Sequence, residues 1–415
     1  MNMNETPGGE RIHIGLFGKR NAGKSSLLNA ISGQQMAIVS EVKGTTTDPV
    51  RKAMELLPLG PVVLIDTPGL DDDGILGEER IKKTEEILRR VDLLLLVLDM
   101  EDIAEDGDGN VCRMLVAKSR ERNIPFLICL NKADLVEEKI REDLLDRLAE
   151  ELSIEKEDIS VVSAKEKQGI EELKEKMAKL LRKNANEVPL VRDLLQPGDT
   201  VVLVVPIDSA APKGRLILPQ QQVIRDALEA GAIPVVTRET ELELTMRQLC
   251  CPPKLVVTDS QVFRKVSEIL PEDQLLTSFS ILMARYKGDL GTQIAGAKAI
   301  EQLKDGDIVL ISEGCTHHRQ CEDIGTVKMP RWIRDYIQKD ISFSFTSGGE
   351  FPQDLSAYAL IVHCGGCMLN PKEMRYRLTK GVQQQIPVTN YGVLIAYMNG
   401  ILDRVIHPFE TGRPA

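Results

Sequence analysis

The sequence GKRNAGKS, residues 18–25, lies between an apolar run, RIHIGLF, and a helical pattern, KSSLLNAIS. It matches the pattern G-x-x-x-x-G-K-[ST], in which a glycine-rich turn between a strand and a helix wraps a phosphate group. The glycines let backbone amides point inward, Lys24 reaches the outer phosphates, and the Ser25 hydroxyl binds Mg²⁺. The stretch therefore predicts a phosphate-binding loop. Its predicted nucleotide contacts are Gly18, Asn21, Ala22, Gly23, Lys24, Ser25 and Ser26.

Three further motifs follow, each at the end of an apolar run. DTPG (66–69) closes VVLID, which places Asp66 to hold the Mg²⁺ shell and Gly69 to move with the γ-phosphate. NKAD (131–134) follows PFLICL, and its Asp134 carboxylate can accept two hydrogen bonds from the guanine edge that adenine cannot supply in the same way. SAK (163–165) follows ISVV and can offer a backbone N–H to the guanine carbonyl. The four motifs together predict a GTPase with further nucleotide contacts at Asn131, Lys132, Asp134, Ser163, Ala164 and Lys165.

The order of apolar runs and helical patterns predicts an α/β protein of three domains. Strands alternate with helices from residue 11 to 183, which indicates a doubly wound P-loop GTPase sheet. The irregular segment 182–199 is expected to be a linker. Two smaller α/β patterns follow it. We expect a GTPase domain over 1–183, a second domain over 190–280 and a third over 281–415.

Composition and charge limit the classes of function. A net charge of −11 and an aromatic content of 4% argue against a nucleic-acid binder or an anionic-membrane binder. The N-terminal stretch lacks the apolar core of a signal peptide, and the most apolar run, LLLLVL at 93–98, is too short to cross a bilayer. We therefore expect a cytoplasmic protein, in which the eight cysteines are free, catalytic or metal-bound rather than paired in disulfides.

The GTPase half resembles the translation-factor-related GTPases of the Era and TrmE type. GTTTD (44–48) matches their switch-I pattern, so the resemblance implies that Thr46 binds Mg²⁺, with Thr45 and Thr47 as alternatives. Asn21 occupies the position that accompanies a potassium ion in TrmE-like proteins. Leu70 stands where Ras-like proteins carry a water-orienting glutamine, and leucine cannot orient water by hydrogen bonding. These features predict slow intrinsic hydrolysis that K⁺ accelerates.

A second group of chemically reactive residues lies in the last third of the chain. GCTHH (314–318) follows DIVLIS, and HCGGC (363–367) follows YALIV, so both lie in loops after apolar strands. If those strands are parallel neighbours, the loops meet at one sheet edge. The residue types suit a redox pair, a Cys₃His zinc site or an iron–sulfur cluster, and buried cysteines without a cofactor are a further alternative. The redox pair leaves Cys315 and His317 unexplained, which favours the cluster. The other cysteines include Cys112 and Cys129, which are expected to lie in the core.

A GTPase followed by C-x-H and H-C-x-x-C resembles the FeFe-hydrogenase maturation GTPase family, HydF, over nearly the full chain. The resemblance implies that residues 190–280 form a dimerisation domain and residues 281–415 bind a 4Fe–4S cluster. Cys315, Cys364 and Cys367 would supply the thiolates, and His363 or His317 a variable fourth ligand. It further implies a homodimeric scaffold that receives a di-iron carbonyl/cyanide precursor with help from two radical-SAM maturases and passes it to apo FeFe-hydrogenase. GTP, Mg²⁺, K⁺ and the cluster would be its cofactors.

One alternative function follows from the GTPase half alone. A ribosome- or tRNA-associated GTPase with a C-terminal zinc module would carry the same N-terminal motifs. The acidic net charge and the lack of a basic, aromatic-rich segment count against it.

Overall fold

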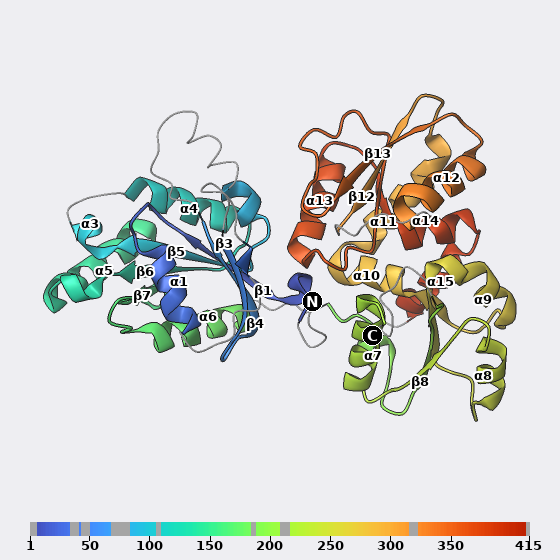
Figure 1. The fold of residues 1–415 in the computed structure, drawn as a ribbon, viewed down its shortest axis with the longest axis horizontal. Helices are drawn as coiled ribbons and strands as arrows, with labels where there is room; N and C mark the ends of the chain where they lie inside the picture. Colours follow the sequence, from blue (N-terminus) through green and yellow to red (C-terminus); the bar gives the residue numbers. More distant parts are fainter. Residues whose placement is uncertain are drawn as a thin grey trace. The chain divides into compact units, whose positions relative to one another are not determined.

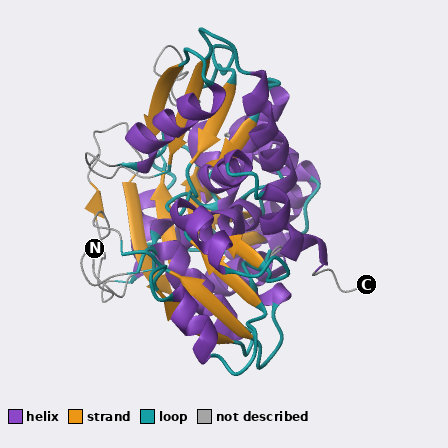
Figure 2. Ribbon diagram, turned by 90° about the vertical axis from the view of Figure 1, so that its right-hand side faces the viewer, coloured by secondary structure: helices purple, strands orange, loops and turns teal. Residues whose placement is uncertain are grey.

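The structure is a computed structural model, and it describes residues 6–33, 41–42, 50–67, 84–104, 109–183, 188–207, 216–314 and 323–411. The chain divides into two compact units, Met1–Asn186 and Glu187–Ala415, and each is described here by itself (Figure 1). Helices pack along the strands (Figure 2). No helix within these ranges combines the length and the apolar character needed to span a membrane.

The described part of the first unit contains one seven-stranded sheet in the order β2-β3-β4-β1-β5-β6-β7. Strands β4, β1, β5, β6 and β7 are parallel, whereas β2 and β3 are antiparallel to their neighbours. The strands are β1 Ile12–Phe17, β2 Glu41–Val42, β3 Val50–Leu56, β4 Gly60–Asp66, β5 Leu93–Asp99, β6 Phe126–Asn131 and β7 Ile159–Val161. The helices are α1 Lys24–Ser32, α3 Met100–Ala104, α4 Gly109–Glu121, α5 Glu138–Leu152 and α6 Ile170–Lys183, with 3-10 turns η1 Gly8–Glu10, η2 Ala133–Leu135 and η3 Lys156–Asp158.

Strand β5 shows why this sheet is covered on both faces. All seven of its residues are buried, which is typical of a central parallel strand. Leu93, Leu95 and Val97 pack with residues of α1 and α6, while the alternate leucines pack with residues of α4 and α5. Because successive side chains point to opposite faces, one apolar run supplies two cores. The predicted doubly wound α/β sheet is confirmed.

The second unit contains, in its described residues, two four-stranded parallel sheets in the orders β11-β10-β8-β9 and β13-β12-β14-β15. The first sheet consists of β8 Thr200–Val204, β9 Ile233–Thr237, β10 Leu255–Thr258 and β11 Leu276–Ser278. The second consists of β12 Ile308–Glu313, β13 Ser342–Ser347, β14 Leu360–His363 and β15 Val388–Asn390. The helices are α7 Leu218–Glu229, α8 Leu242–Gln248, α9 Phe263–Ile269, α10 Phe279–Lys287, α11 Leu290–Lys298, α12 Met329–Ile337, α13 Pro371–Gln383, α14 Tyr391–Met398 and α15 Leu402–Thr411, with short turns η4 Arg192–Leu194, η5 Ser260–Val262, η6 Ala299–Gln302 and the π-helix η7 Ile324–Lys328.

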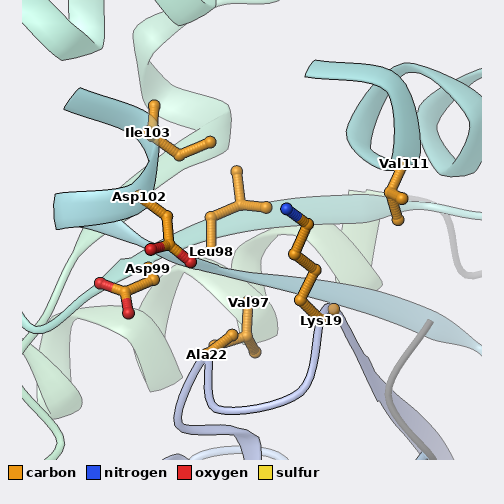
Figure 3. A pocket seen from close by; sticks show the side chains of 9 residues that line it. Lys19, Ala22, Val97, Leu98, Asp99, Asp102, Ile103 and Val111 are labelled. Atoms are coloured by element: carbon orange, nitrogen blue, oxygen red, sulfur yellow. The ribbon is translucent and has the colours of Figure 1, made fainter. Parts of the chain in front are cut away.

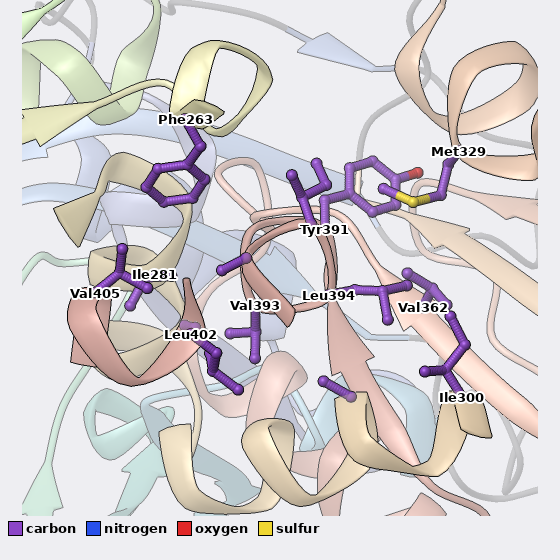
Figure 4. Close-up of a cluster of buried hydrophobic side chains, with 14 of the residues drawn as sticks. Phe263, Ile281, Ile300, Met329, Val362, Tyr391, Val393, Leu394, Leu402 and Val405 are labelled. Atoms are coloured by element: carbon purple, nitrogen blue, oxygen red, sulfur yellow. The ribbon is translucent and has the colours of Figure 1, made fainter. Parts of the chain in front are cut away.

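A single buried cluster joins these two sheets. It contains Val202 and Val256 from the first sheet, Val309 and Val362 from the second, and residues of α10, α14 and α15. Helix α14 contributes from several sides because it is apolar all round, as expected of a helix enclosed by other elements. Figure 4 shows Val393 and Leu394 of α14 between Ile281 and Val362. The domain boundary expected at residues 280 and 281 falls within α10 and stays a prediction.

Candidate functional site: a nucleotide pocket and a cysteine loop

The predicted phosphate-binding loop connects β1 to α1 and has the backbone geometry that its glycines allow. Gly18 has a φ of 150°, and a Cβ there would lie 2.2 Å from the Val97 carbonyl oxygen. Gly23 has a φ of 87°, and a Cβ there would lie 2.2 Å from Asn131 Nδ2. Both contacts are closer than real Cβ atoms tolerate, so neither position accepts a side chain without rearrangement. Gly23 directly precedes α1, so the loop leads into a helix N-terminus, where backbone amides can face an anion.

Lys24, Ser25 and Asp66 lie together at the carboxyl edge of β1 and β4. The buried Lys24 ammonium donates to the carbonyls of Gly18 at 2.9 Å and Lys19 at 2.5 Å. The Ser25 hydroxyl donates to Asp66 Oδ2 at 2.5 Å. Burial raises the pKa of Asp66, although the Ser25 hydrogen bond and the Lys24 charge act in the opposite direction. A hydroxyl beside a carboxylate is an oxygen pair of the kind that Mg²⁺ prefers, so these residues fit the ion.

Asn131 connects the phosphate-binding loop to the SAK loop. Its side chain is buried and donates through Nδ2 to the Ala22 carbonyl at 3.0 Å, while its Oδ1 accepts from the Ala164 N–H at 3.0 Å. Of the SAK amides, one of which was expected to donate to the guanine carbonyl, that of Ala164 is therefore engaged within the protein. Asn131 therefore links the phosphate-binding loop to the SAK loop through two hydrogen bonds.

Asp134 lies in η2, directly after β6, and its carboxylate accepts a hydrogen bond from the Ser163 hydroxyl at 2.5 Å. This bond lowers the pKa of Asp134, so the carboxylate is ionised at neutral pH and acts as an acceptor. Lys132 has a left-handed backbone, with a φ of 64°, and its ammonium pairs with the buried Asp99 at the end of β5. The hydrogen bond to Asp99 raises the pKa of Lys132.

A pocket lies between the phosphate-binding loop and the end of β5. Figure 3 shows the carboxylates of Asp99 and Asp102 together on one side and the Lys19 side chain on the other, with Leu98 between them. The lining residues are Gly18, Lys19, Ala22, Val97, Leu98, Asp99, Asp102, Ile103 and Val111.

The other predicted nucleotide residues are placed as follows. Asn21 is exposed in the loop with a φ of 64°, and Ser26 is exposed in the first turn of α1. Lys165 is exposed beside Glu166, with a 3.8 Å ion pair. Thr46 and Gly69, with Thr45, Thr47 and Leu70, lie outside the described residues, as do Cys315 and His317 of the second site.

The C-x-x-C loop begins directly after β14, at the carboxyl edge of the second sheet. Strands β12 and β14 are parallel neighbours in register Ser312 to His363, and the Gly314 amide after β12 lies next to the Cys364 sulfur. The Cys364 sulfur accepts hydrogen bonds from the Gly314 N–H at 3.0 Å and the Gly366 N–H at 3.3 Å. Such bonds stabilise a thiolate over a thiol, so Cys364 suits a metal ligand. The condition set in the sequence analysis, that the two strands are parallel neighbours, is met. The meeting of the two cysteine loops stays a prediction, because Cys315 lies outside the described residues.

His363 points into the protein beneath this edge. Its Nε2 lies 3.0 Å from Arg377 Nη1 and its Nδ1 lies 3.1 Å from the Cys364 carbonyl oxygen. Arginine can only donate, so Nε2 accepts and Nδ1–H donates to the carbonyl. Burial, and secondarily the Arg377 charge, lowers the pKa of His363 to about 3, so the ring is neutral. Its assignment as the fourth ligand stays a prediction, and ligation would require one of these two bonds to break.

Two fully buried cations support the loop, and the sequence analysis missed both. Lys287 of α10 donates from Nζ to the carbonyls of Cys367 and Leu369 at 3.0 and 2.9 Å. Arg377 of α13 pairs with the buried Glu373 at 3.0 Å. A lysine before a glycine and an i, i+4 Glu–Arg pair are both typical of exposed helix surface, so no sequence signal marked either residue. Among the described residues, no group of three His, Cys, Asp or Glu side chains is arranged to hold a metal ion.

Comparison with known proteins identifies the domains. Residues 13–132 match the 50S ribosome-binding GTPase family. Residues 190–288 match the hydrogen maturase F dimerization domain, and residues 291–408 match the hydrogen maturase F tetramerization domain. The two maturase matches together cover more than half of the chain.

Curated relatives and solved structures are similar to parts of the chain. The tRNA modification GTPase MnmE of Coxiella burnetii is 36% identical to this chain over 135 residues. That of Heliobacterium modesticaldum is 34% identical over 215 residues. These matches cover 32% and 52% of this chain, and 29% and 39% of the relatives, so the chain spans about a third of the length of the curated proteins it matches.

Two solved structures are also similar to parts of this chain. A probable GTP-binding protein engB is 21% identical with a TM-score of 0.34, over 41% of this chain and 99% of that one. Aquifex aeolicus Era is 19% identical with a TM-score of 0.33, over 62% of this chain and 97% of that one. The GTPase domain supports the binding of GTP and Mg²⁺, and the two maturase domains support oligomerisation. The chain belongs to the HydF family of hydrogenase maturation GTPases.

Proposed function

We propose that the chain hydrolyses GTP and acts as a 4Fe–4S scaffold or carrier for the di-iron precursor of the FeFe-hydrogenase active site. One observation carries the proposal furthest. In a chain of the hydrogen maturase family, Cys364 lies at a parallel sheet edge with its sulfur oriented by two amide hydrogen bonds, next to the residue that precedes Cys315. The proposal places the reaction in the cytoplasm, where thiols stay reduced.

The GTPase site supports the first half of this proposal. Lys24 would contact the outer phosphates, and Ser25 and Asp66, with Thr46, would hold Mg²⁺, which neutralises charge on the phosphates. The ionised Asp134 carboxylate would accept from the two N–H donors of the guanine edge. Because Ala164 already donates to Asn131, we assign the guanine carbonyl contact to another amide of the SAK loop. Binding would order residues around Thr46 and Gly69, and hydrolysis would release them.

We further propose that K⁺ accelerates hydrolysis through Asn21. The amide side chain of Asn21 is exposed on a left-handed turn of the phosphate-binding loop. A carboxamide oxygen there can coordinate a monovalent cation beside the phosphates, where added positive charge stabilises the transition state. Leu70 supplies no hydrogen bond to water, so the charge of the cation would carry this part of catalysis.

The cysteine loop supports the second half. Cys315, Cys364 and Cys367 would be the cluster thiolates, which leaves one iron that can take an exchangeable ligand such as a cyanide nitrogen of the di-iron precursor. Gly366 has a φ of 62°, and a Cβ there would lie 2.7 Å from Met374 Sδ, so the loop stays free of side chains at this point. Since both ring nitrogens of His363 are engaged, we assign the fourth position to His317 or to the cargo itself.

The proposed homodimer would use the edge strand β9. This strand ends its sheet, and Ile233 and Val236 are 55% and 47% exposed. Leu228 of α7 and Leu244 of α8, two helices that pack on opposite faces of this sheet, are also exposed. Interfaces between strands of two chains commonly form where a sheet edge carries exposed apolar side chains. Radical-SAM maturases that supply the precursor and the apo-hydrogenase that receives it are the proposed transient partners.

The test is delivery of cargo. The anaerobically reconstituted protein is loaded with a synthetic di-iron carbonyl/cyanide complex and mixed with apo FeFe-hydrogenase, and hydrogen evolution is measured. We expect activation by the wild type and by Lys24→Ala in this cargo-loaded assay, and none by Cys364→Ala. In cells with both maturases, Lys24→Ala should block maturation while its iron content stays intact. Equal activation by Cys364→Ala would overturn the carrier function, and loss of iron in Lys24→Ala would overturn the separation of the two sites.

A further inference from the structure

The loop that carries Cys364 and Cys367 rests on a buried lysine. Lys287 is the last residue of α10 and has no solvent-exposed surface. Its Nζ lies 2.9 Å from the Leu369 carbonyl oxygen, 3.0 Å from that of Cys367 and 3.4 Å from that of Gly366. An ammonium has three protons to donate, so it matches three carbonyl oxygens that converge on one point. The C-terminal half of the loop is therefore wrapped around a positive charge.

Backbone hydrogen bonds also hold the loop. The Cys364 N–H donates to the Ser312 carbonyl at 3.0 Å, and the Leu369 N–H donates to the Gly366 carbonyl at 3.0 Å. Strand β12 thus holds the start of the loop, a tight turn shapes its middle, and Lys287 holds its end. Replacement of the ammonium by an apolar group would take a charged donor away from the Cys367 and Leu369 carbonyl oxygens, whereas the Gly366 carbonyl would keep the Leu369 N–H.

We propose that Lys287 is a positioning residue that holds the C-x-x-C loop in its ligand geometry and supplies a positive charge beneath the cluster. This inference rests on the proposed function, because it assumes a cluster bound by Cys364 and Cys367. A cluster with three thiolates is anionic, and its reduced form carries one more negative charge. A cation fixed in a low-dielectric interior stabilises the thiolates and favours the reduced form.

The same helix ties the loop to the first sheet of the unit. Phe279, Leu282 and Met283 of α10 lie in the core formed with β8 and β10. At the N-terminal end of α10, the Ser280 hydroxyl accepts from the Gly392 N–H at 3.2 Å. Helix α10 is therefore held by the core of the first sheet and by α14, which restricts the movement of Lys287. A charge that is held in place can stabilise the negative cluster without reorganisation of the protein.

The test compares Lys287→Met with Lys287→Arg and with a matched control, Arg285→Met. Arg285 lies in the same last turn of α10, but its guanidinium pairs with Asp193 and stacks on Phe409. Each full-length protein is reconstituted anaerobically, and two quantities are measured. One is the rate at which a chelator removes iron, and the other is the midpoint potential of the cluster in an EPR-monitored redox titration.

We expect Lys287→Met to lose iron at least about tenfold faster than wild type, the equivalent of about 1.4 kcal/mol, and to shift the midpoint potential to more negative values. Lys287→Arg should recover part of both properties, and Arg285→Met should match the wild type. A Lys287→Met protein that matches Arg285→Met in both measurements overturns the inference.

Two further outcomes distinguish a failure of the Lys287 inference from a failure of the proposed function. A wild-type protein that takes up no iron overturns the proposed function itself, and with it the electrostatic role of Lys287. If Lys287→Met does not fold, amide hydrogen exchange on the wild-type apoprotein decides the anchoring role. The Leu369 amide should be protected before cluster loading, and exchange at the rate of an unstructured peptide would refute the anchor.

Discussion

Removal of the buried Arg377 charge should destabilise the second unit strongly, because its partner is also buried. Arg377 has no exposed surface and Glu373 is 2% exposed. The guanidinium donates to Glu373 Oε1 at 3.0 Å, to the Ser312 hydroxyl at 3.2 Å and to the Gly348 carbonyl at 2.9 Å, and it holds His363 through Nε2. Arg377→Met keeps an unbranched apolar chain but leaves the carboxylate without this cation.

The size of the effect follows from the burial of the pair. Breaking a buried ion pair by removing one partner costs about 3–5 kcal/mol, because the remaining charge is left uncompensated. With a urea m-value of about 3 kcal/mol per molar, at the upper end for small proteins, the midpoint should fall by about 1–1.7 M. The double variant Arg377→Met/Glu373→Gln removes the uncompensated charge, so its midpoint should return part of the way.

The chain offers a specific probe for this measurement. Its single tryptophan, Trp332 in α12, packs against the core of the second unit, so tryptophan fluorescence reports urea unfolding of that unit alone. Arg375→Met is the matched control, because Arg375 is an exposed cation on the same helix and its loss should change stability by less than about 0.5 kcal/mol. Equal midpoints for Arg377→Met and Arg375→Met would refute the reasoning.

Three more predictions concern the first unit. Asn131→Ala should cost about 2–4 kcal/mol by leaving the Ala22 carbonyl and the Ala164 amide unpaired, and GTP affinity measured by calorimetry should fall about tenfold or more as the two loops separate. An unchanged affinity would show that Asn131 does not position the loops. GTP turnover should be faster in KCl than in NaCl, and Asn21→Ala should abolish the difference. Turnover that is equal in the two salts for the wild type would contradict the role of Asn21. Burial raises the pKa of Cys112 to about 12 and that of Cys129 further, so at pH 8 both stay as neutral thiols. Mass spectrometry after iodoacetamide treatment should therefore find the exposed Cys250 and Cys251 alkylated, and labelling of Cys129 at the same rate would contradict its burial.

The nucleotide half of the molecule could be predicted from sequence because its motifs are local. Each motif directly follows an apolar strand, and parallel strands bring their carboxyl ends to one edge. The run LLLLVL, too short to cross a bilayer, forms a buried strand, since an unbroken apolar run suits a strand covered on both faces. Asn131 was predicted to contact the nucleotide, whereas its bridge between Ala22 and Ala164 depends on tertiary contacts that no motif specifies.

The sequence predicted that the C-x-x-C loop follows a parallel strand, but not which buried residues contact it. Strands β12 and β14 are parallel neighbours, as the argument required, and the Gly314 amide contacts the Cys364 sulfur. His363 stands in a typical ligand motif, yet both of its ring nitrogens have protein partners. Lys287 and Arg377 have the sequence spacing of surface residues, and only the packing of α10 and α13 buries them. Burial of a charge is decided by elements far apart in sequence, so local patterns carry no trace of it.

The most direct test of the scaffold proposal is anaerobic iron and sulfide analysis with EPR on the wild type and on Cys315→Ala, Cys364→Ala and Cys367→Ala. We expect the wild type to contain iron and sulfide in equal amounts and, after reduction, to show the signal of a 4Fe–4S cluster. Each variant should lose most of both. A colourless wild-type protein that contains zinc, or an iron signal that survives all three substitutions, would contradict the account.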